Sequence, residues 1–561
     1  MCGIIGIVGD KPVSGRLIES LKRLEYRGYD SAGVAGFVAG RSERRRAKGK
    51  ISALETVLAE VPLSASTGIG HTRWATHGKP SEANAHPHAY GRVTVVHNGI
   101  IENFAELKHE LAGKGHVFSS DTDTEVFAHL VDQYLTDGLA PLDAFRTALG
   151  RLTGAYALAV MIEGDEQHLY GARKGSPLVV GYGDGEMFIG SDALAVGPFT
   201  NRVSYLDEGD FVAIDKASAR VFDASGKPVE RPVKVVAAAA ALVEKGNYRH
   251  FMEKEIHDQP EAILNSLSSF VDPVAGKASA PGVDFAGLER IQIVACGTAY
   301  ISGLIGKYLF EQLADLPVDV EIASEFRYRT PAVRPGTLAL AISQSGETAD
   351  TLAALRWCAA KGLATAAIVN AHESTMAREA GVMWPTRAGP EIGVASTKAF
   401  TAQVAVLTSL AIAAAAARGK IDAAQEARLV RSLTEAPRLV AASIALEPQI
   451  HKIALEIAKA RDVLYLGRGP MYAMALEGAL KLKEISYIHA EGYAAGELKH
   501  GPIALVDENV PVIVIAPCDS FFEKTASNMS EVIARGGKVV MITDEEGAAH
   551  APAGAEVIVA P

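Results

Sequence analysis

The second residue of the chain is a cysteine, in the run Met1-Cys2-Gly3. If Met1 is removed, Cys2 carries both a thiol and a free α-amine, whose ordinary pKa is about 7.7–8.0. Part of this amine is then unprotonated at neutral pH and can accept the proton of the thiol, as in nucleophiles activated by an N-terminal amine. Taken alone, Cys2 is better explained as a small apolar residue ahead of an apolar strand.

Four polar segments of the N-terminal half supply the other groups that amide hydrolysis by a thiol requires: residues 27–30, 71–78, 97–99 and 120–125. The oxyanion of an acyl-transfer intermediate needs two donors, which the Asn98 side-chain amide and the Gly99 backbone N–H can provide. A free amino acid needs a guanidinium for its carboxylate and a carboxylate for its ammonium group. Arg73 and Asp123 have this chemistry, and Trp74 can cover the site and exclude water.

Each segment also has an ordinary structural interpretation. Asn98-Gly99 after the apolar run 93–96 is a hairpin signal, and Asp121 or Asp123 ahead of a helix is a good N-cap. The histidines at positions 71, 77, 86, 88 and 97 match no standard metal-site spacing, so ordinary polar roles are favoured and no metal is expected.

Together, the runs CGI, YRGYDSAG, HTRWATHG, HNGIIEN and SDTDTE resemble the class II, N-terminal-nucleophile glutamine amidotransferases. The resemblance implies that Cys2 is the nucleophile and that Asn98 and Gly99 form the oxyanion hole. It also implies a glutamine site made of Arg73, Trp74, Thr76, His77 and Asp123, with Gly78 nearby.

In the C-terminal half, the run SQSGET (343–348) lies between a predicted buried strand and a predicted helix over 349–360. Hydroxyl and backbone N–H groups converge there on a helix N-terminus, which is a natural phosphate site. It is not a Walker A loop, because no GK[ST] follows at the required spacing. The alternative is simple helix capping by Ser345 or Thr348. A second polar turn, Ser396-Thr397-Lys398, is a sugar contact or another cap.

Glu477, Lys481 and Glu484 lie on one face of a predicted helix. A lone row of this kind is usually a surface ion-pair row, but here Glu491, Glu497 and His500 follow within an otherwise apolar or small-residue stretch. A histidine with a Lys–Glu pair suits sugar ring opening and proton transfer between neighbouring carbons.

The runs GTAYISG, ISQSGETADT, EIGVASTKAFT and the segment 466–502 resemble tandem sugar isomerase (SIS) domains and, over nearly all of residues 2–561, the glutamine–fructose-6-phosphate aminotransferase family. The resemblance implies that Glu484 shuttles a proton, His500 opens the ring and Lys481 supports them. It places the sugar phosphate on Thr298, Ser343, Gln344, Ser345, Thr348 and Val394. The expected reaction uses glutamine and fructose 6-phosphate to give glucosamine 6-phosphate and glutamate, the first step of hexosamine synthesis, and implies no metal, nucleotide or organic cofactor.

Two departures from the family pattern stand out. Ala299 occupies a position where the family usually has a serine, so we expect one hydroxyl contact to the substrate to be missing. Family members continue past residue 561 with a tail that closes the sugar site and supplies an imine-forming lysine, and no residue here matches it. An alternative function is therefore a glutaminase coupled to a non-catalytic phosphosugar-binding module. A phosphoribosyl-type amidotransferase is disfavoured, because no acidic diphosphate-binding loop follows a buried strand.

The elements that must position these residues differ between the two halves. Short apolar runs at 4–8, 33–38, 93–96, 155–162 and 211–214, with helical patterns at 13–24, 103–112 and 125–136, predict a layered α+β (αββα) domain. After residue 290 the pattern changes to strand, Gly/Ser turn and long helix, which predicts α/β units with parallel sheets. Gly297, Ser343 and Val369 correspond in order to Gly467, Pro517 and Thr543, so two tandem copies are expected.

The predicted domains are a class II glutaminase at 2–238, a linker at 239–280, a first SIS domain at 281–425 and a second, incomplete at its C-terminus, at 453–561. The net charge of −11 disfavours non-specific nucleic acid binding. The four separated cysteines fit a reducing cytoplasm, and the N-terminus has no signal-peptide pattern. The apolar stretch 402–417 is expected to be a buried helix, not a membrane span. A homodimer is expected.

Overall fold

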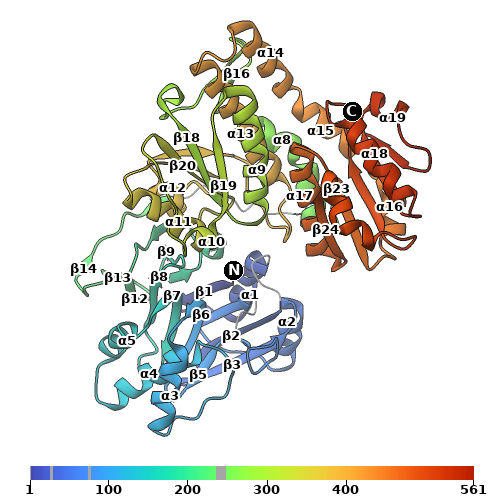
Figure 1. The fold of residues 1–561 in the computed structure, drawn as a ribbon. Coiled ribbons are helices and arrows are strands. Elements are labelled where there is room, and N and C mark those ends of the chain that lie inside the picture. The colour runs from blue at the N-terminus through green and yellow to red at the C-terminus, as the bar shows by residue number, and fades with distance from the viewer. Residues whose placement is uncertain (1, 26–29, 74–77, 236–244, 246–247) are drawn as a thin grey trace. The chain divides into compact units, whose positions relative to one another are not determined.

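The computed structural model describes residues 2–25, 30–73, 78–235, 245 and 248–561, and the chain forms two compact units, 1–244 and 245–561 (Figure 1). Trp74, Thr76 and His77, which were assigned to the glutamine site, lie outside the described residues. The two units are considered separately below.

The first unit contains two antiparallel sheets. One has eight strands in the order β15 (Lys234–Val235), β11 (Arg202–Tyr205), β9 (Val179–Tyr182), β10 (Met187–Gly190), β1 (Gly3–Val8), β4 (Thr67–Arg73), β2 (Ser31–Val38) and β3 (Arg41–Lys48). The other has seven, in the order β14 (Pro228–Val229), β13 (Ala219–Phe222), β12 (Phe211–Ile214), β8 (Leu169–Lys174), β7 (Gly154–Ile162), β6 (Val93–Ile101) and β5 (His88–Tyr90).

Three hydrophobic cores make this unit a four-layer αββα structure, as the sequence predicted. Helices α1 (Ser14–Leu24), α2 (Ile51–Glu60) and α6 (Ala193–Val196) cover the first sheet. Helices α3 (Phe104–Gly113), α4 (Glu125–Thr136) and α5 (Pro141–Leu149) cover the second, and the third core joins the two sheets.

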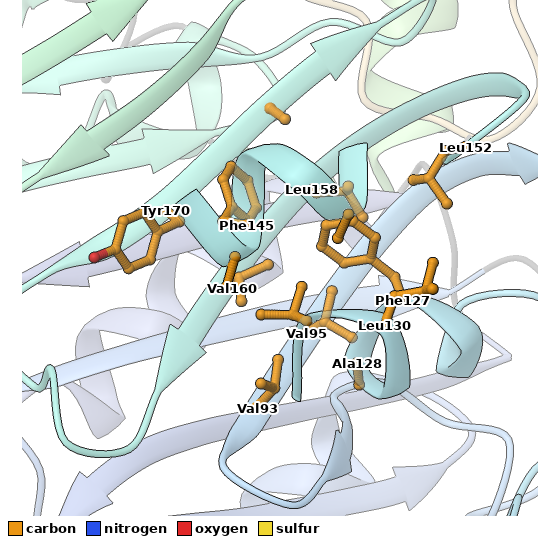
Figure 2. Close-up of a cluster of buried hydrophobic side chains, with 14 of the residues drawn as sticks. Val93, Val95, Phe127, Ala128, Leu130, Phe145, Leu152, Leu158, Val160 and Tyr170 are labelled. Atoms are coloured by element: carbon orange, nitrogen blue, oxygen red, sulfur yellow. The ribbon is translucent and has the colours of Figure 1, made fainter. Parts of the chain in front are cut away.

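Strand β7 is apolar along its length because both of its faces are buried. Successive strand residues point to opposite faces of the sheet. Leu158 and Val160 accordingly pack in the core beneath the helices, whereas Ala157, Ala159 and Met161 pack between the sheets. Figure 2 shows the helix side of this arrangement, in which Phe127 of α4 and Phe145 of α5 lie over the sheet with their ring centroids 5.8 Å apart.

A local turn signal was overridden in β6, whereas the basic run at 41–50 behaves as its sequence suggested. Asn98 and Gly99 form no hairpin, because β6 continues through them to Ile101 and pairs with β7, Asn98 opposite Ala157 and Gly99 opposite Tyr156. The basic run 41–50, for which a solvated loop and strand edge was favoured over an anion-binding patch, contains the edge strand β3, and Arg44, Arg45 and Arg46 donate to backbone carbonyls. Arg46, for example, donates to Ala83 O and Ala85 O at 3.2 and 3.1 Å.

The second unit contains two five-stranded parallel sheets with the same strand order, which confirms the predicted repeat. The first is β19 (Val318–Ile322), β18 (Arg290–Ala295), β20 (Thr337–Ser343), β21 (Ala364–Val369) and β22 (Val382–Pro385). The second is β24 (His489–Ala494), β23 (Asp462–Gly467), β25 (Pro511–Ile515), β26 (Lys538–Thr543) and β27 (Glu556–Val559).

Helices surround both sheets of the second unit. Those of the first copy are α9 (Gly297–Ala314), α10 (Ala323–Phe326), α11 (Ala349–Ala360), α12 (Thr375–Glu379) and α13 (Lys398–Ala417), with the 3-10 turn η3 (Phe285–Gly287). The connection is α14 (Ala423–Thr434), α15 (Ala436–Ile444) and α16 (Glu447–Ile457). The second copy has α17 (Pro470–Ser486), η4 (Ala495–His500), η5 (Pro502–Leu505), α18 (Phe522–Ile533) and α19 (Glu545–Ala549). A small core of Ile301, Ile305, Phe400 and Ala473 joins α9, α13 and α17 across the two copies.

The predicted linker 239–280 contains structure of its own. It forms α7 (Phe251–His257), α8 (Gln259–Leu267) and the short hairpin β16 (Val271–Asp272) and β17 (Lys277–Ala278). Ile263 and Leu267 of α8 are buried against Ala405 of α13. The boundary between the two compact units falls after Glu244, inside this range.

Helix α13 is the one helix, within the described ranges, that is long and apolar enough to cross a membrane by length and composition. Most of it is buried inside the second unit, as expected for the core helix predicted over 402–417.

Candidate functional site

The first candidate site lies where β1, β4 and β6 meet. Cys2 directly precedes β1 and is half-buried, and the side-chain amide Nδ2 of Asn98 in β6 donates to the Cys2 carbonyl at 2.8 Å. Because Gly3 pairs with Thr72, the beginning of β1 lies beside the end of β4, where Arg73 is located. The two sheets thus bring together three predicted residues that are far apart in the sequence.

Gly99 occupies a backbone conformation that requires glycine. Its φ is +133°, and a Cβ built there would stand 2.0 Å from the carbonyl oxygen of Ala155 on β7. Only glycine combines this φ with such close backbone approach. The chain therefore adopts a special geometry at the residue whose N–H was predicted to bind the oxyanion.

Arg73 and Asp123 are both nearly fully buried, at 3% and 4% exposure. The guanidinium of Arg73 donates to Gly78 O at 2.9 Å and lies 4.0 Å from the Asp30 carboxylate. Asp123 does not cap α4; its carboxylate accepts the backbone N–H of Ile101 at 2.8 Å. The two side chains predicted to bind the charged groups of an amino acid substrate are therefore each held by a backbone group. Arg73 is held by Gly78 O, beyond the end of β4, and Asp123 by the N–H of Ile101, at the end of β6.

A group of buried histidines contacts Asn98 and Thr124. His86 and His97 both contact the hydroxyl of Thr124, at 2.9 and 3.0 Å, and His71 stacks on His86 with ring centroids 4.2 Å apart. Burial lowers the pKa of His71 and of His88 to about 3, and that of His86 well below its ordinary value. These rings are neutral at physiological pH. Among the described residues no group of His, Cys, Asp and Glu is arranged to hold a metal ion.

The second candidate site begins at the SQSGET turn, between β20 and α11. The hydroxyls of Ser343 and Thr348 lie 3.1 Å apart, and Ser343 Oγ accepts the N–H of Gly346 at 3.0 Å. Thr348 is the N-cap residue of α11, yet its side chain makes no capping hydrogen bond, and neither does that of Ser345, which accepts the N–H of Glu347. The turn is thus held in shape by its own hydroxyl groups at the start of a 12-residue helix.

The helix α17 of the second copy faces α9 of the first through a polar cluster. Thr298 Oγ1 donates to Glu477 at 2.9 Å and lies 3.1 Å from Lys481 Nζ. Lys481 is 3.4 Å from Glu477 and 2.6 Å from Glu484. The row is therefore not a surface ion-pair row, because Glu477 is only 5% exposed.

Burial raises the pKa of Glu477, against the opposing effects of Lys481 and Thr298. Glu477 was recognised as a member of the helix face but was given no role from the sequence. Its i,i+4 spacing to Lys481 was the signal in the sequence that the two residues share a helix face. Its burial could not be predicted from that spacing, because it depends on contact with helix α9. Thr124 and Asp30 were likewise named only as parts of motifs, and His71 was named besides only among the histidines considered for a metal site.

The remaining predicted residues lie outside these contacts. Val394 is 47% exposed in the segment between β22 and α13, and His500 is exposed at the end of η4. Gln344 lies within the SQSGET turn, where its backbone carbonyl accepts the N–H groups of Asn370 and Ala371. Ala299 lies in the first turn of α9, next to Thr298.

Known protein families and individual proteins match the sequences of both units. The SIS domain family matches residues 285–413 and 456–559, and the glutamine amidotransferase domain family matches residues 71–196. A protein of Caulobacter vibrioides named glutamine–fructose-6-phosphate aminotransferase (isomerizing) is 73% identical over 560 residues, which cover 100% of this chain and 92% of that protein. A protein of the same name from Bradyrhizobium diazoefficiens is 59% identical over 98% of this chain and 91% of its own length.

A solved structure supports the same relationship for the second unit. The C-terminal domain of glucosamine-fructose-6-phosphate aminotransferase from Francisella tularensis is 41% identical and superimposes with a TM-score of 0.55, covering 57% of this chain and 90% of the solved chain.

Proposed function

The chain belongs to the family of glutamine–fructose-6-phosphate aminotransferases (isomerizing), and from that premise we propose which residues carry each step. The reaction hydrolyses glutamine and transfers its amide nitrogen to fructose 6-phosphate, which is isomerised to glucosamine 6-phosphate. The observation that carries the assignment is the contact of 2.8 Å between the Asn98 amide nitrogen and the carbonyl of Cys2.

In the first unit, the thiol of Cys2 attacks the amide carbon of glutamine after Met1 has been removed. The α-amine of Cys2 takes the thiol proton and delivers it to the departing ammonia. The negative oxygen of the tetrahedral intermediate accepts hydrogen bonds from Asn98 Nδ2 and the Gly99 N–H. Water then cleaves the thioester to release glutamate. Arg73 and Asp123 bind the carboxylate and ammonium groups of the substrate, together with the predicted Trp74, Thr76 and His77.

In the second unit, the SQSGET turn binds the phosphate of the sugar through Ser343, Gln344, Ser345 and Thr348 and the N-terminus of α11. Thr298 and Val394 complete the predicted sugar site. Glu484, 2.6 Å from Lys481, moves the proton between C1 and C2, and His500 opens the ring.

Ammonia released into water at neutral pH is mostly protonated, and ammonium is not a nucleophile. We therefore propose that ammonia passes from the glutaminase to the sugar without release to solvent, as expected from the exclusion of water at such sites. A homodimer in the cytoplasm remains the proposed state of the protein.

The thiol assignment is tested by labelling the protein with an electrophilic glutamine analogue and mapping the modified peptide by mass spectrometry. The label is expected on Cys2 of a chain that has lost Met1, and label on any other residue contradicts the assignment.

The phosphate assignment is tested with Ser345→Ala and Thr348→Ala. Loss of a hydrogen bond to a charged group costs about 1.5–3 kcal/mol, so KM for fructose 6-phosphate should rise roughly 10- to 100-fold. KM for glutamine in the same preparations is the control and should not change. An unaltered KM for the sugar in both variants removes the turn from the phosphate site.

A further inference from the structure

One buried imidazole beside Cys2 has no role in the reaction as described so far. His71 lies on β4, two positions before Arg73, and its side chain is fully buried. Its Nε2 atom is 3.0 Å from the backbone carbonyl oxygen of His97 and 3.0 Å from the side-chain oxygen of Asn98. The second of these contacts reaches the residue that faces the nucleophile.

The carbonyl of His97 identifies the nitrogen of His71 that carries the proton. A backbone carbonyl can only accept a hydrogen bond, so Nε2 must be a donor. Burial lowers the pKa of His71 to about 3, so the ring has a single proton at physiological pH. Nδ1 is then unprotonated, and it has no hydrogen-bond partner in the described part of the chain. His71 is therefore held as one tautomer.

This tautomer determines which way the amide of Asn98 points. Since Nε2–H is a donor, the atom of Asn98 that it meets must be the oxygen, and the amide nitrogen faces the other way. On that side it meets the Cys2 carbonyl, which again can only accept, at 2.8 Å. A reversed amide would place two acceptors together at Cys2 and two donors together at His71.

We propose that His71 is a positioning residue that holds the Asn98 amide with its nitrogen directed at the Cys2 site, so that this nitrogen is available to the oxyanion. This inference rests on the proposed role of Asn98 in glutamine hydrolysis. His71 does not contact the substrate in this account and acts only through Asn98. Its loss should therefore reduce kcat for glutamine hydrolysis and leave KM for glutamine little changed.

The test is a double-mutant cycle on the full-length enzyme with His71→Met and Asn98→Ala. Removing one oxyanion donor costs about 10²–10³-fold in kcat, which is the loss expected for Asn98→Ala. His71→Met should lower kcat about 10- to 100-fold, with KM for glutamine within about threefold of wild type. The double variant should be no slower than Asn98→Ala alone, because His71 has nothing left to position. Losses that multiply in the double variant overturn the proposal, as does a wild-type kcat in His71→Met.

Two matched variants separate positioning from packing. Glutamine has nearly the shape of methionine but carries an N–H donor, so His71→Gln should keep kcat within about fivefold of wild type. A folded His71→Gln enzyme as slow as Asn98→Ala contradicts the proposal even if His71→Met does not fold. His88 is equally buried, but its Nε2 contacts Thr122 and not Asn98. His88→Leu should therefore retain kcat within about threefold, and a loss equal to that of His71→Met would show a general packing effect.

Alkylation of Cys2 by iodoacetamide distinguishes this inference from the assignment of the nucleophile. Alkylation needs the thiolate but forms no oxyanion, so its rate should be the same in wild type and His71→Met. If Cys2→Ala retains full glutaminase activity, the proposed function itself fails. If Cys2 is essential and His71→Met is fully active, only the role of His71 fails.

Discussion

Replacing Gly99 by alanine tests whether the backbone geometry of β6 serves the predicted oxyanion site. A Cβ at this position would stand 2.0 Å from the Ala155 carbonyl oxygen and 2.8 Å from its carbon, so β6 and β7 must separate locally. The φ of +133° is also nearly restricted to glycine, and such strain costs about 1–3 kcal/mol. Forcing one extra carbon into close packing adds about 1–3 kcal/mol. We expect a total loss of about 2–6 kcal/mol.

Gly164 provides the matched control. It also has a positive φ, +91°, but a Cβ there would have no neighbour within 4 Å. Gly164→Ala should therefore cost only the conformational strain, about 1–2 kcal/mol.

Hydrogen–deuterium exchange of peptides from β6 and β7, in the full chain, measures the local opening free energy in each variant. Gly99→Ala should also lower kcat for glutamine hydrolysis at least about 100-fold, because the backbone N–H moves away from the oxyanion. Exchange protection equal to that of Gly164→Ala, together with a wild-type kcat, would refute the reasoning.

Three further outcomes are expected. Arg73→Lys keeps the charge but loses the planar fork of donors, so KM for glutamine should rise about 10- to 100-fold in steady-state assays while the sugar KM is unchanged. Thr298→Val removes the hydroxyl between Glu477 and Lys481, and should lower glucosamine 6-phosphate synthesis about 10-fold with glutamine hydrolysis intact, as measured by parallel product assays. Glu255 lies in α7, is 2% exposed and accepts the backbone N–H of Gly393 at 3.0 Å. Burial raises the pKa of its carboxyl from 4.5 to about 7, so the stability contributed by its protonated form is complete below pH 4.5 and is lost as pH rises through 7. In urea unfolding, wild type should lose about 3 kcal/mol over this interval relative to Glu255→Gln.

The architecture could be predicted because its signals extend over many residues. The continuous apolar run of β7 indicated a strand covered on both faces, and the repeated strand–turn–helix pattern indicated two copies of one parallel-sheet unit. Both signals arise from burial, which constrains every residue along an element. The same holds for α11, whose predicted range 349–360 is the observed one.

At two positions a distant partner outweighs the local preference that was given as the alternative interpretation. Asn98-Gly99 has the sequence of a turn, but pairing with β7 continues through both residues and keeps them in the strand. Asp123 has the chemistry of a helix cap, yet its carboxylate is satisfied by the backbone N–H of Ile101. Neither partner lies within a sequence window that a local pattern can include.

The linker and Glu477 show the same limit in the second unit. Helices α7 and α8 are short, and the apolar residues Ile263 and Leu267 of α8 are explained only by their packing against Ala405 of α13. Glu477 was placed on the correct helix face, but its burial depends on Thr298 in the other copy, 179 residues away. Spacing within a helix shows which residues share a face, and it does not show what that face meets.

The contact of Thr298 with Glu477 and Lys481 has an evolutionary consequence. The two copies share one strand order, but this polar group is assembled across the seam between them, so neither half reproduces it alone. Once residues on both sides depend on each other, a change on α9 must be matched on α17, and the halves can no longer diverge independently. The shared strand order therefore carries an unequal division of this polar group, in which the first copy supplies the hydroxyl and the second supplies the carboxylate and the ammonium group.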